Sequence, residues 1–206
     1  MKITPRSSVR QVAAAIADTL GKAKIRAVLT GGACATIYSG GEYQSEDLDL
    51  ILQAPPTQTA LDEAMAKAGF SRRKDHYEHP NTRFFVEFPR GPLSIGSDVS
   101  VRPARLLVGR VRVILLSATD SCRDRLAAFY HWKDRQSLRV AVAIAARHPV
   151  DLKGIRSWSE REGASREFEE FMEELCVAKA ARRRAGHLKR VAAARLALRL
   201  RAHRNT

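Results

Sequence analysis

The sequence predicts an α+β fold in which a mixed αβ half, residues 1–116, precedes a helical half, residues 117–175, and a basic tail, residues 176–206. Short apolar runs alternate with helical patterns up to Leu116, and from Ser117 onward only helical periodicity remains. The tail holds ten Lys or Arg residues and no acid, and subtracting these ten from the formal charge of +14 leaves +4 for residues 1–175. The basic character of the protein therefore belongs mainly to the tail.

Elements of both classes are expected in the first half. A helix should follow a cap at Ser7 or Ser8 and end at Gly21, and a short helix should follow Gly31-Gly32. Another helix should follow the prolines at 55–56 and end near Gly69. Branched apolar runs predict strands at residues 25–30, 48–52 and 81–89, and a hairpin over 105–116 that turns at Gly109-Arg110.

The second half is predicted to be helical because capping residues precede each amphipathic run. Ser117 with Asp120 makes a capping box, and Asp134 and Asp151 can cap the next two helices. Residues 166–184 predict a fourth helix that continues into the tail. Trp132 and Trp158 are expected in the core or between helices.

Composition excludes several classes of protein. The chain of 206 residues, 45% hydrophobic, suits one sizeable domain or a domain with a smaller partner. It has no apolar run near 18 residues and no apolar signal core, so a cytoplasmic protein without a membrane partner is expected. Cys34, Cys122 and Cys176 form no CxxC pair, which argues against a disulfide framework or a zinc ribbon.

Two acids inside an apolar run are the main candidates for chemistry. Asp47 and Asp49 alternate with leucines, and an aspartate between leucines is costly to desolvate unless it is paired or binds a cation. On a strand both carboxylates point to one face about 6.5 Å apart, where they can converge on a divalent cation such as Mg²⁺. Two-metal phosphoryl transfer needs a third carboxylate. Glu87 is predicted for that role, with Asp98 as the fallback.

Gly31-Gly32 fits the same chemistry. It follows a strand and opens a helix, so backbone N–H groups and the helix N-terminus can meet phosphate oxygens where a side chain would keep them out. A lone Gly-Gly is usually only a turn, and a lone Asp-x-Asp usually marks a solvated strand end. Their combination, with fourteen residues between Gly32 and Asp47, is more specific.

This pattern over residues 20–165 resembles the DNA polymerase beta-type nucleotidyltransferase superfamily. The order of a small αβ half and a helical half is similar to the AbiEii-like (abortive-infection toxin-type) nucleotidyltransferases. The resemblance implies a nucleotidyltransferase-type mixed sheet with flanking helices and a helical half. It also implies Mg²⁺- or Mn²⁺-dependent transfer of a nucleoside monophosphate from an NTP to an acceptor hydroxyl.

The resemblance also implies roles for individual residues. Gly31 and Gly32 would hold the triphosphate, Ser45 would support the motif loop, Asp47 and Asp49 would bind metal, and Glu87 would complete the triad. Lys133-Asp134 would correspond to a Lys/Arg-Asp pair near the nucleotide, and Lys133 or Arg83 could offset charge on the leaving pyrophosphate. The chain departs from the AbiEii pattern, because WKDRQSLRV replaces a longer Lys-Arg-Asp run followed by Asp-Leu.

The acceptor and the role of the tail stay open. A toxin-like relative would modify tRNA or a protein hydroxyl, and a cognate antitoxin would be encoded beside it. The ten tail cations could contact an RNA backbone, or the tail could be an inert extension or a membrane-surface helix. The alternative function is a non-catalytic nucleotide- or RNA-binding module that retains the fold.

Overall fold

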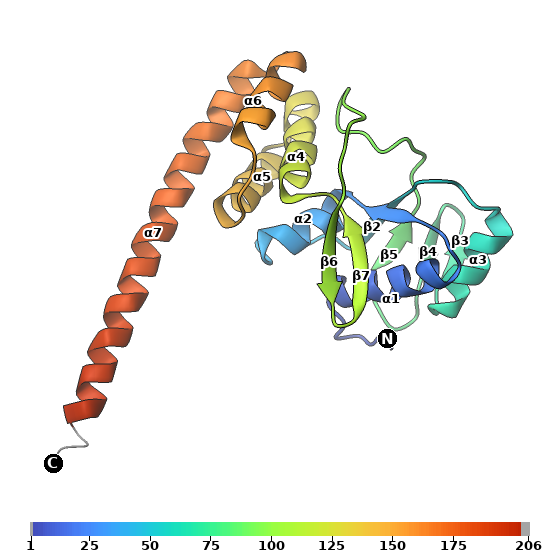
Figure 1. The fold of residues 1–206 in the computed structure, drawn as a ribbon, viewed down its shortest axis with the longest axis horizontal. Coiled ribbons are helices and arrows are strands. Elements are labelled where there is room, and N and C mark those ends of the chain that lie inside the picture. Colours follow the sequence, from blue (N-terminus) through green and yellow to red (C-terminus); the bar gives the residue numbers. More distant parts are fainter. Residues whose placement is uncertain (1, 203–206) are drawn as a thin grey trace.

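The computed structural model describes residues 2–202, without the side chains of residue 187 and residues 189–202. A seven-stranded sheet forms the centre of the first half (Figure 1), in the order β3-β4-β5-β2-β1-β7-β6. The strands are β1 (Ala27–Leu29), β2 (Asp47–Leu52), β3 (Ser71–Arg73), β4 (His76–Glu78), β5 (Phe85–Glu87), β6 (Ala104–Val108) and β7 (Val111–Leu115). β2 pairs with β5, and β1 with β7, in parallel, while the other neighbours are antiparallel. The predicted α+β mixed sheet is confirmed.

Three helices accompany this sheet: α1 (Val9–Lys22), α2 (Gly31–Ser39) and α3 (Gln58–Lys67). Ser8 caps α1 in a capping box with Gln11, and Thr57 caps α3. α1 presents an almost continuous apolar face to the sheet, with Val12 and Ile16 fully buried. Leu48 and Leu50 of β2 belong to the same core, so the alternate residues of β2 face away from it.

Several predicted boundaries were wrong. α1 continues through Gly21 to Lys22, because a single glycine near a helix end costs only about 1 kcal/mol. The strand predicted over residues 81–89 is only Phe85–Glu87, and the one over 25–30 is only Ala27–Leu29. The hairpin of β3 and β4 was not predicted, since its turn uses Lys74 at φ 55° rather than a glycine. The hairpin of β6 and β7 was predicted correctly, including its turn.

From Ala118 onward the described chain is helical, with α4 (Ala118–Trp132), α5 (Arg135–Arg147), α6 (Leu152–Arg161) and α7 (Ser165–Ala202). Ser117, Asp134 and Asp151 cap α4, α5 and α6 as predicted. Trp158 is 1% exposed, as expected of a core residue. Trp132 is 77% exposed, so its assignment to the core was wrong.

The last helix, α7, begins against α5 and α6 and then extends away from them (Figure 1). Its inner face buries Phe168, Phe171 and Leu175. The boundary predicted at residue 176 falls inside this one helix. Most of the tail cations lie at positions whose side chains are outside the described residues. No described helix is both long enough and apolar enough to cross a membrane.

Candidate functional site

β2 carries Asp47 and Asp49 on its face away from the core. Leu48 and Leu50 are 0% and 5% exposed, whereas both aspartates are half-buried on the opposite face. The two-residue period of the strand therefore places both carboxylates together, as the sequence predicts. Ser45 lies just before the strand, and its Oγ donates a hydrogen bond to Asp47 Oδ1. The backbone N–H of Ser45 donates to Thr36 Oγ1 of α2 at 3.0 Å, which fixes the loop against that helix.

Glu87 reaches the same face from the neighbouring strand. β5 runs parallel to β2, and Glu87 is the register partner of Asp49. Partners in a parallel pair project to one face, so the side chains of Glu87, Asp49 and Asp47 share it. Asp98, the fallback, lies elsewhere: it accepts a 2.6 Å bond from Arg123 and one of 2.8 Å from the Ser100 N–H.

Both glycines of the motif sit against these side chains. Gly31 begins α2 with φ +59°, and a Cβ added there would overlap the Asp49 carboxylate. A Cβ on Gly32 would overlap Ser45 Oγ. Thr30, directly before them, donates its N–H to the Asp49 backbone carbonyl at 2.9 Å. The start of α2, with its unpaired N–H groups, is therefore held against the acidic face of β2.

The carboxylates of this face repel one another. Burial raises the pKa of Asp49 to about 6, and the negative charges of Asp47 and Glu87 add to that rise. The pKa of Asp98, by contrast, is lowered by the Ser100 N–H and by Arg123. The acidic face thus holds more negative charge than its protein surroundings neutralise, which is the condition in which a cation binds favourably.

Asp124 and Arg125 of α4 lie near enough to Asp49 to act on its pKa, Asp124 upward and Arg125 downward, and the sequence analysis did not assign them to the site. Arg125 donates from Nε at 3.0 Å and from Nη2 at 2.6 Å to Asp124 Oδ2. Burial lowers the pKa of Arg125, but the negative charge and hydrogen bonds of Asp124, with a smaller contribution from Asp49, raise it overall. The only sequence signal for them is an acid next to a base within a predicted helix. In the structure they lie beside the buried Arg123 and Leu126.

Two predicted cations have other partners. Lys133 ends α4 in a left-handed conformation, and its Nζ pairs with Glu167 of α7 at 2.5 Å. Arg83 donates to Gln44 at 3.0 Å and lies 3.4 Å from a carboxylate oxygen of Glu46, on the wall of a cavity of about 430 Å³ that also includes Ser45. Neither pairs with Asp47, Asp49 or Glu87. The charge of Arg125, by contrast, lowers the pKa of Asp49.

The fit of a metal ion can be judged from these donors. Within residues 2–202, no group of three or more His, Cys, Asp or Glu side chains is arranged so that it could hold a metal ion. Mg²⁺ commonly takes one or two protein carboxylates and fills its octahedron with water and phosphate oxygens. Asp47 and Asp49, close together on one face with uncompensated charge, fit that mode of binding.

Comparison with known proteins supports the fold. No family model matches the chain, and no curated protein matches it. Among solved structures, it is similar to an antigenic nucleotidyltransferase-like protein from Paracoccidioides brasiliensis, with 18% identity and a TM-score of 0.53 over 69% of this chain and 77% of that one.

Two further matches are structures of ANT(2'')-Ia. The solution structure of this antibiotic-resistance factor has 14% identity and a TM-score of 0.42, and covers 89% of this chain and 97% of that one. The crystal structure with adenylyl-2''-tobramycin has 12% identity and a TM-score of 0.46, and covers 78% and 98%. From the match to the Paracoccidioides protein, the chain has a nucleotidyltransferase-like fold.

Proposed function

We propose that this protein is a nucleotidyltransferase that moves a nucleoside monophosphate from an NTP to an acceptor hydroxyl with Mg²⁺ or Mn²⁺. The observation that carries the proposal is the shared face of Asp47, Asp49 and Glu87 beside the glycine start of α2. This places an uncompensated acidic cluster directly against a helix N-terminus. In this reaction a metal ion binds to the acidic cluster and the triphosphate binds to the helix N-terminus, so the two features must lie side by side.

Each residue has a specific task in this proposal. Asp47 and Asp49 hold the metal, and Ser45 orients Asp47 through its hydrogen bond. Glu87 is the third carboxylate, and Gly31 and Gly32 let the triphosphate approach the backbone of α2. The metal would supply positive charge to the phosphate oxygens and lower the pKa of the acceptor hydroxyl.

In this proposal the role that the sequence analysis gave to Lys133, offsetting negative charge on the pyrophosphate, belongs to Arg125. Lys133 is 67% exposed and paired with Glu167, whereas Arg125 is 17% exposed and lies in the electrostatic field of Asp49. Its guanidinium remains charged under all working conditions and matches phosphate geometry. In this proposal Arg125 offsets charge that develops on the leaving pyrophosphate, and Asp124 orients it.

The acceptor is proposed to be an RNA such as tRNA, with a protein hydroxyl as the competing acceptor. The formal charge of +14 favours a polyanionic acceptor, and the half-buried Lys179 and the exposed Arg182, Arg183 and Arg184 of α7 offer phosphate contacts. The AbiEii-like pattern further suggests a toxin with a cognate antitoxin. A neighbouring gene that encodes an antitoxin able to bind this protein would be the first support for that role.

One assay tests the proposal. The protein is incubated with each labelled NTP in turn, with Mg²⁺ and with total cellular RNA or total protein. We expect label in one macromolecular fraction with one NTP, lost with a chelator and with Asp49→Asn. Asp18→Asn is the matched control, because Asp18 is a surface acid of α1 paired with Lys22.

The outcome separates the alternatives. Label on protein rather than RNA would reassign the acceptor. Metal-dependent NTP binding without label in either fraction would favour the non-catalytic binding module.

A further inference from the structure

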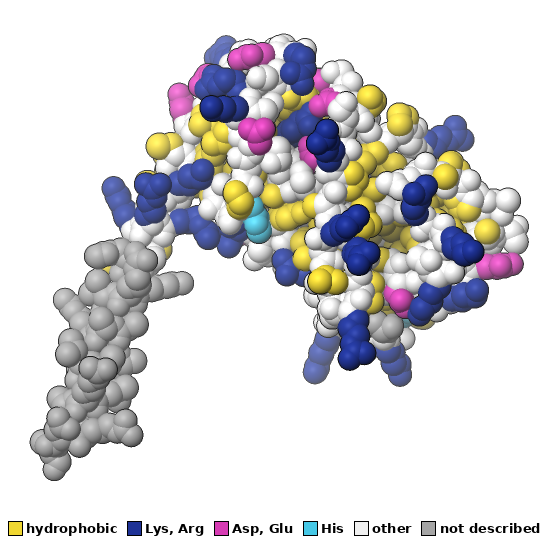
Figure 2. Space-filling model, viewed as in Figure 1, with side chains coloured by type: hydrophobic (Ala, Val, Ile, Leu, Met, Phe, Trp, Pro, Cys, Tyr) yellow, Lys and Arg dark blue, Asp and Glu magenta, His cyan; other side chains and the backbone are white. Residues whose placement is uncertain are grey.

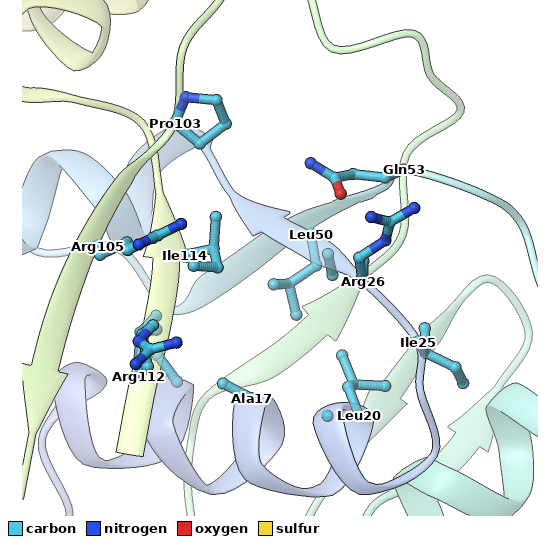
Figure 3. A pocket seen from close by; sticks show the side chains of 14 residues that line it. Ala17, Leu20, Ile25, Arg26, Leu50, Gln53, Pro103, Arg105, Arg112 and Ile114 are labelled. Carbon is cyan, nitrogen blue, oxygen red and sulfur yellow. The ribbon is translucent and has the colours of Figure 1, made fainter. Parts of the chain in front are cut away.

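A second cavity opens where β1 and β7 separate. These parallel strands share only one register pair, Leu29 with Leu115, whereas β6 and β7 share five. The gap between them leads to a cavity of about 510 Å³ with an apolar floor from Ala13, Ala17 and Leu20 of α1 (Figure 3). Leu50 and Val113 complete the apolar lining. This volume lies within the range of about 300–1,000 Å³ that is typical of small-molecule sites.

The cavity is separate from the acidic site. Leu50 faces it from β2, and Leu50 and Asp49 are successive residues that point to opposite faces of the strand. Arg26 precedes β1, while Asp49 lies beside Thr30 just after that strand. Thr30 is four positions after Arg26, which in extended chain corresponds to about 13 Å. A ligand here would therefore lie about 13 Å from the acidic site and the start of α2.

Three arginines surround the opening: Arg26, Arg105 and Arg112 (Figure 3). All three are exposed, none forms an ion pair with an acid in the described part of the chain, and no acid lines the cavity. Arg26 and Arg112 each lie three residues before the single register pair, so they flank the gap at equivalent positions. Like charges in such positions repel each other, and an anion between them removes that repulsion. Lys and Arg side chains gather over this hairpin, with hydrophobic side chains between them (Figure 2).

Arginines on an edge strand often only prevent pairing with other chains. That explanation suits Arg105 on the edge strand β6, but not the other two. Arg112 is on β7, which is paired on both sides, and Arg26 is at the far side of the gap. These two guanidiniums need a different explanation, and the apolar floor beneath them offers one.

We propose that this cavity binds a small anion with an aliphatic body, the anionic group between Arg26, Arg105 and Arg112 and the aliphatic part on the α1 floor. Arginine matches the planar, bidentate geometry of carboxylate and phosphate groups. No aromatic side chain lines the cavity, so the body has no ring to stack on and is recognised by apolar contact alone. A nucleotide base therefore fits this site less well than an aliphatic chain.

Gly21 offers a way to close the cavity without disturbing the fold. It lies in α1 on the cavity wall, and a Cβ added there meets nothing within 4 Å. Gly21→Leu therefore fills the space that the aliphatic body would use, and it also improves helix propensity. The charge test is the double variant Arg26→Gln/Arg112→Gln. Its matched control is Arg102→Gln/Arg110→Gln, which removes two charges from the same region but none from the cavity.

The experiment measures binding of hexanoate, octanoate and decanoate to the full chain by calorimetry. We expect the affinity to rise about fourfold per added methylene. It should fall at least tenfold in Gly21→Leu and in Arg26→Gln/Arg112→Gln, and stay within twofold in Arg102→Gln/Arg110→Gln. Decyl phosphate and decanol distinguish the anionic group: decyl phosphate should compete with decanoate, and decanol should bind at least tenfold more weakly.

Other results would overturn the proposal. Affinity that is independent of chain length, or unchanged by Gly21→Leu, would exclude the apolar floor as a binding surface. If none of the carboxylates binds but an RNA oligonucleotide does, and Arg26→Gln/Arg112→Gln weakens that binding, the arginines belong to a nucleic-acid surface instead. Circular dichroism and thermal unfolding of each variant confirm that a lost affinity reflects the cavity and not the fold.

Discussion

Two clusters of acids in this protein differ in one respect, namely whether the fold supplies their counter-charge. In the first, Asp47, Asp49 and Glu87 share one face of the sheet, and the pKa of Asp49 is raised to about 6. In the second, Arg123 donates to both Asp98 and Asp120, at 2.6 and 3.0 Å, and the pKa of Asp98 is lowered. The second cluster stabilises the fold. Among the described side chains the first cluster has no ion pair of this kind, and in the proposed function a bound cation would supply the missing positive charge.

The largest expected effect is loss of function in the first cluster. Asp49→Asn or Asp47→Asn should reduce Mg²⁺-dependent nucleotidyl transfer by about 10³-fold or more, because each removes one of the two carboxylates that hold the metal in the proposed function. Mg²⁺-dependent NTP binding, measured by calorimetry, should be lost as well. Asp98→Asn is the matched variant in the second cluster, and its NTP binding should stay within about threefold of wild type. Equal losses in folded Asp98→Asn and Asp49→Asn proteins would make Asp98 the third ligand.

The next largest effect is on stability, in the second cluster. Arg123→Ala should lower the free energy of unfolding by about 3–5 kcal/mol, because it leaves Asp98 and Asp120 without their buried partner. It also removes a guanidinium that lies 4.9 Å from the centre of the Trp158 ring. Urea unfolding at pH 7 measures the change, with the exposed Arg110→Ala as control. A loss below about 1 kcal/mol would show that this cluster is not the structural one.

A glycine substitution sharpens the geometry of the first cluster. Gly31→Ala should lower transfer activity about 10- to 100-fold, because its Cβ would displace the Asp49 carboxylate. Gly109→Ala is the control: Gly109 has a similar φ of +61°, but its Cβ would meet nothing within 4 Å. Both variants carry about 1 kcal/mol of backbone strain. Only Gly31→Ala should lose activity, and equal losses would trace the effect to strain alone.

Removing the repulsion in the first cluster should stabilise the metal-free protein. Asp49 has a folded pKa near 6, above its ordinary value of 3.8, so its ionised form disfavours the fold and stability falls as pH rises from about 4 to 6. At pH 7.5 Asp49→Asn should therefore raise the free energy of unfolding by about 1–2 kcal/mol after solvent screening. The gain should vanish below about pH 4. Mg²⁺ with NTP should stabilise wild type but not the variant.

The smallest effect is the acid response of the second cluster. The folded pKa of Asp98 lies below its ordinary value, so its contribution is present at neutral pH and is lost as pH falls through the folded pKa. Asp98→Asn should cost about 1–2 kcal/mol at pH 7, and this cost should shrink as the pH falls through the folded pKa of Asp98. Urea unfolding of the wild type and of Asp98→Asn at a series of pH values measures this difference in stability. A difference that stays constant with pH would mean that Arg123 does not act on the ionised carboxylate.

Local sequence determined much of the first cluster. Alternation of Asp and Leu along β2 was enough to place Asp47 and Asp49 on one face, because a strand repeats every two residues. The caps at Ser117, Asp134 and Asp151 were also local, since a capping side chain bonds to an N–H two or three residues away. The assignment of Glu87, Gly31 and Gly32 to the metal and phosphate site remains a prediction that the geometry supports.

Only the tertiary structure decided which charges meet. Asp98 and Arg123 are 25 residues apart, so local sequence does not show that Arg123 is the partner of Asp98. Arg125 acts on the pKa of Asp49, and Lys133 pairs with Glu167, because of how α4 packs against its neighbours, an arrangement that the period of a single helix does not specify. The separation of β1 and β7 depends likewise on pairing between distant strands. Periodicity fixes the face on which a side chain lies, while its partner depends on how the elements pack together.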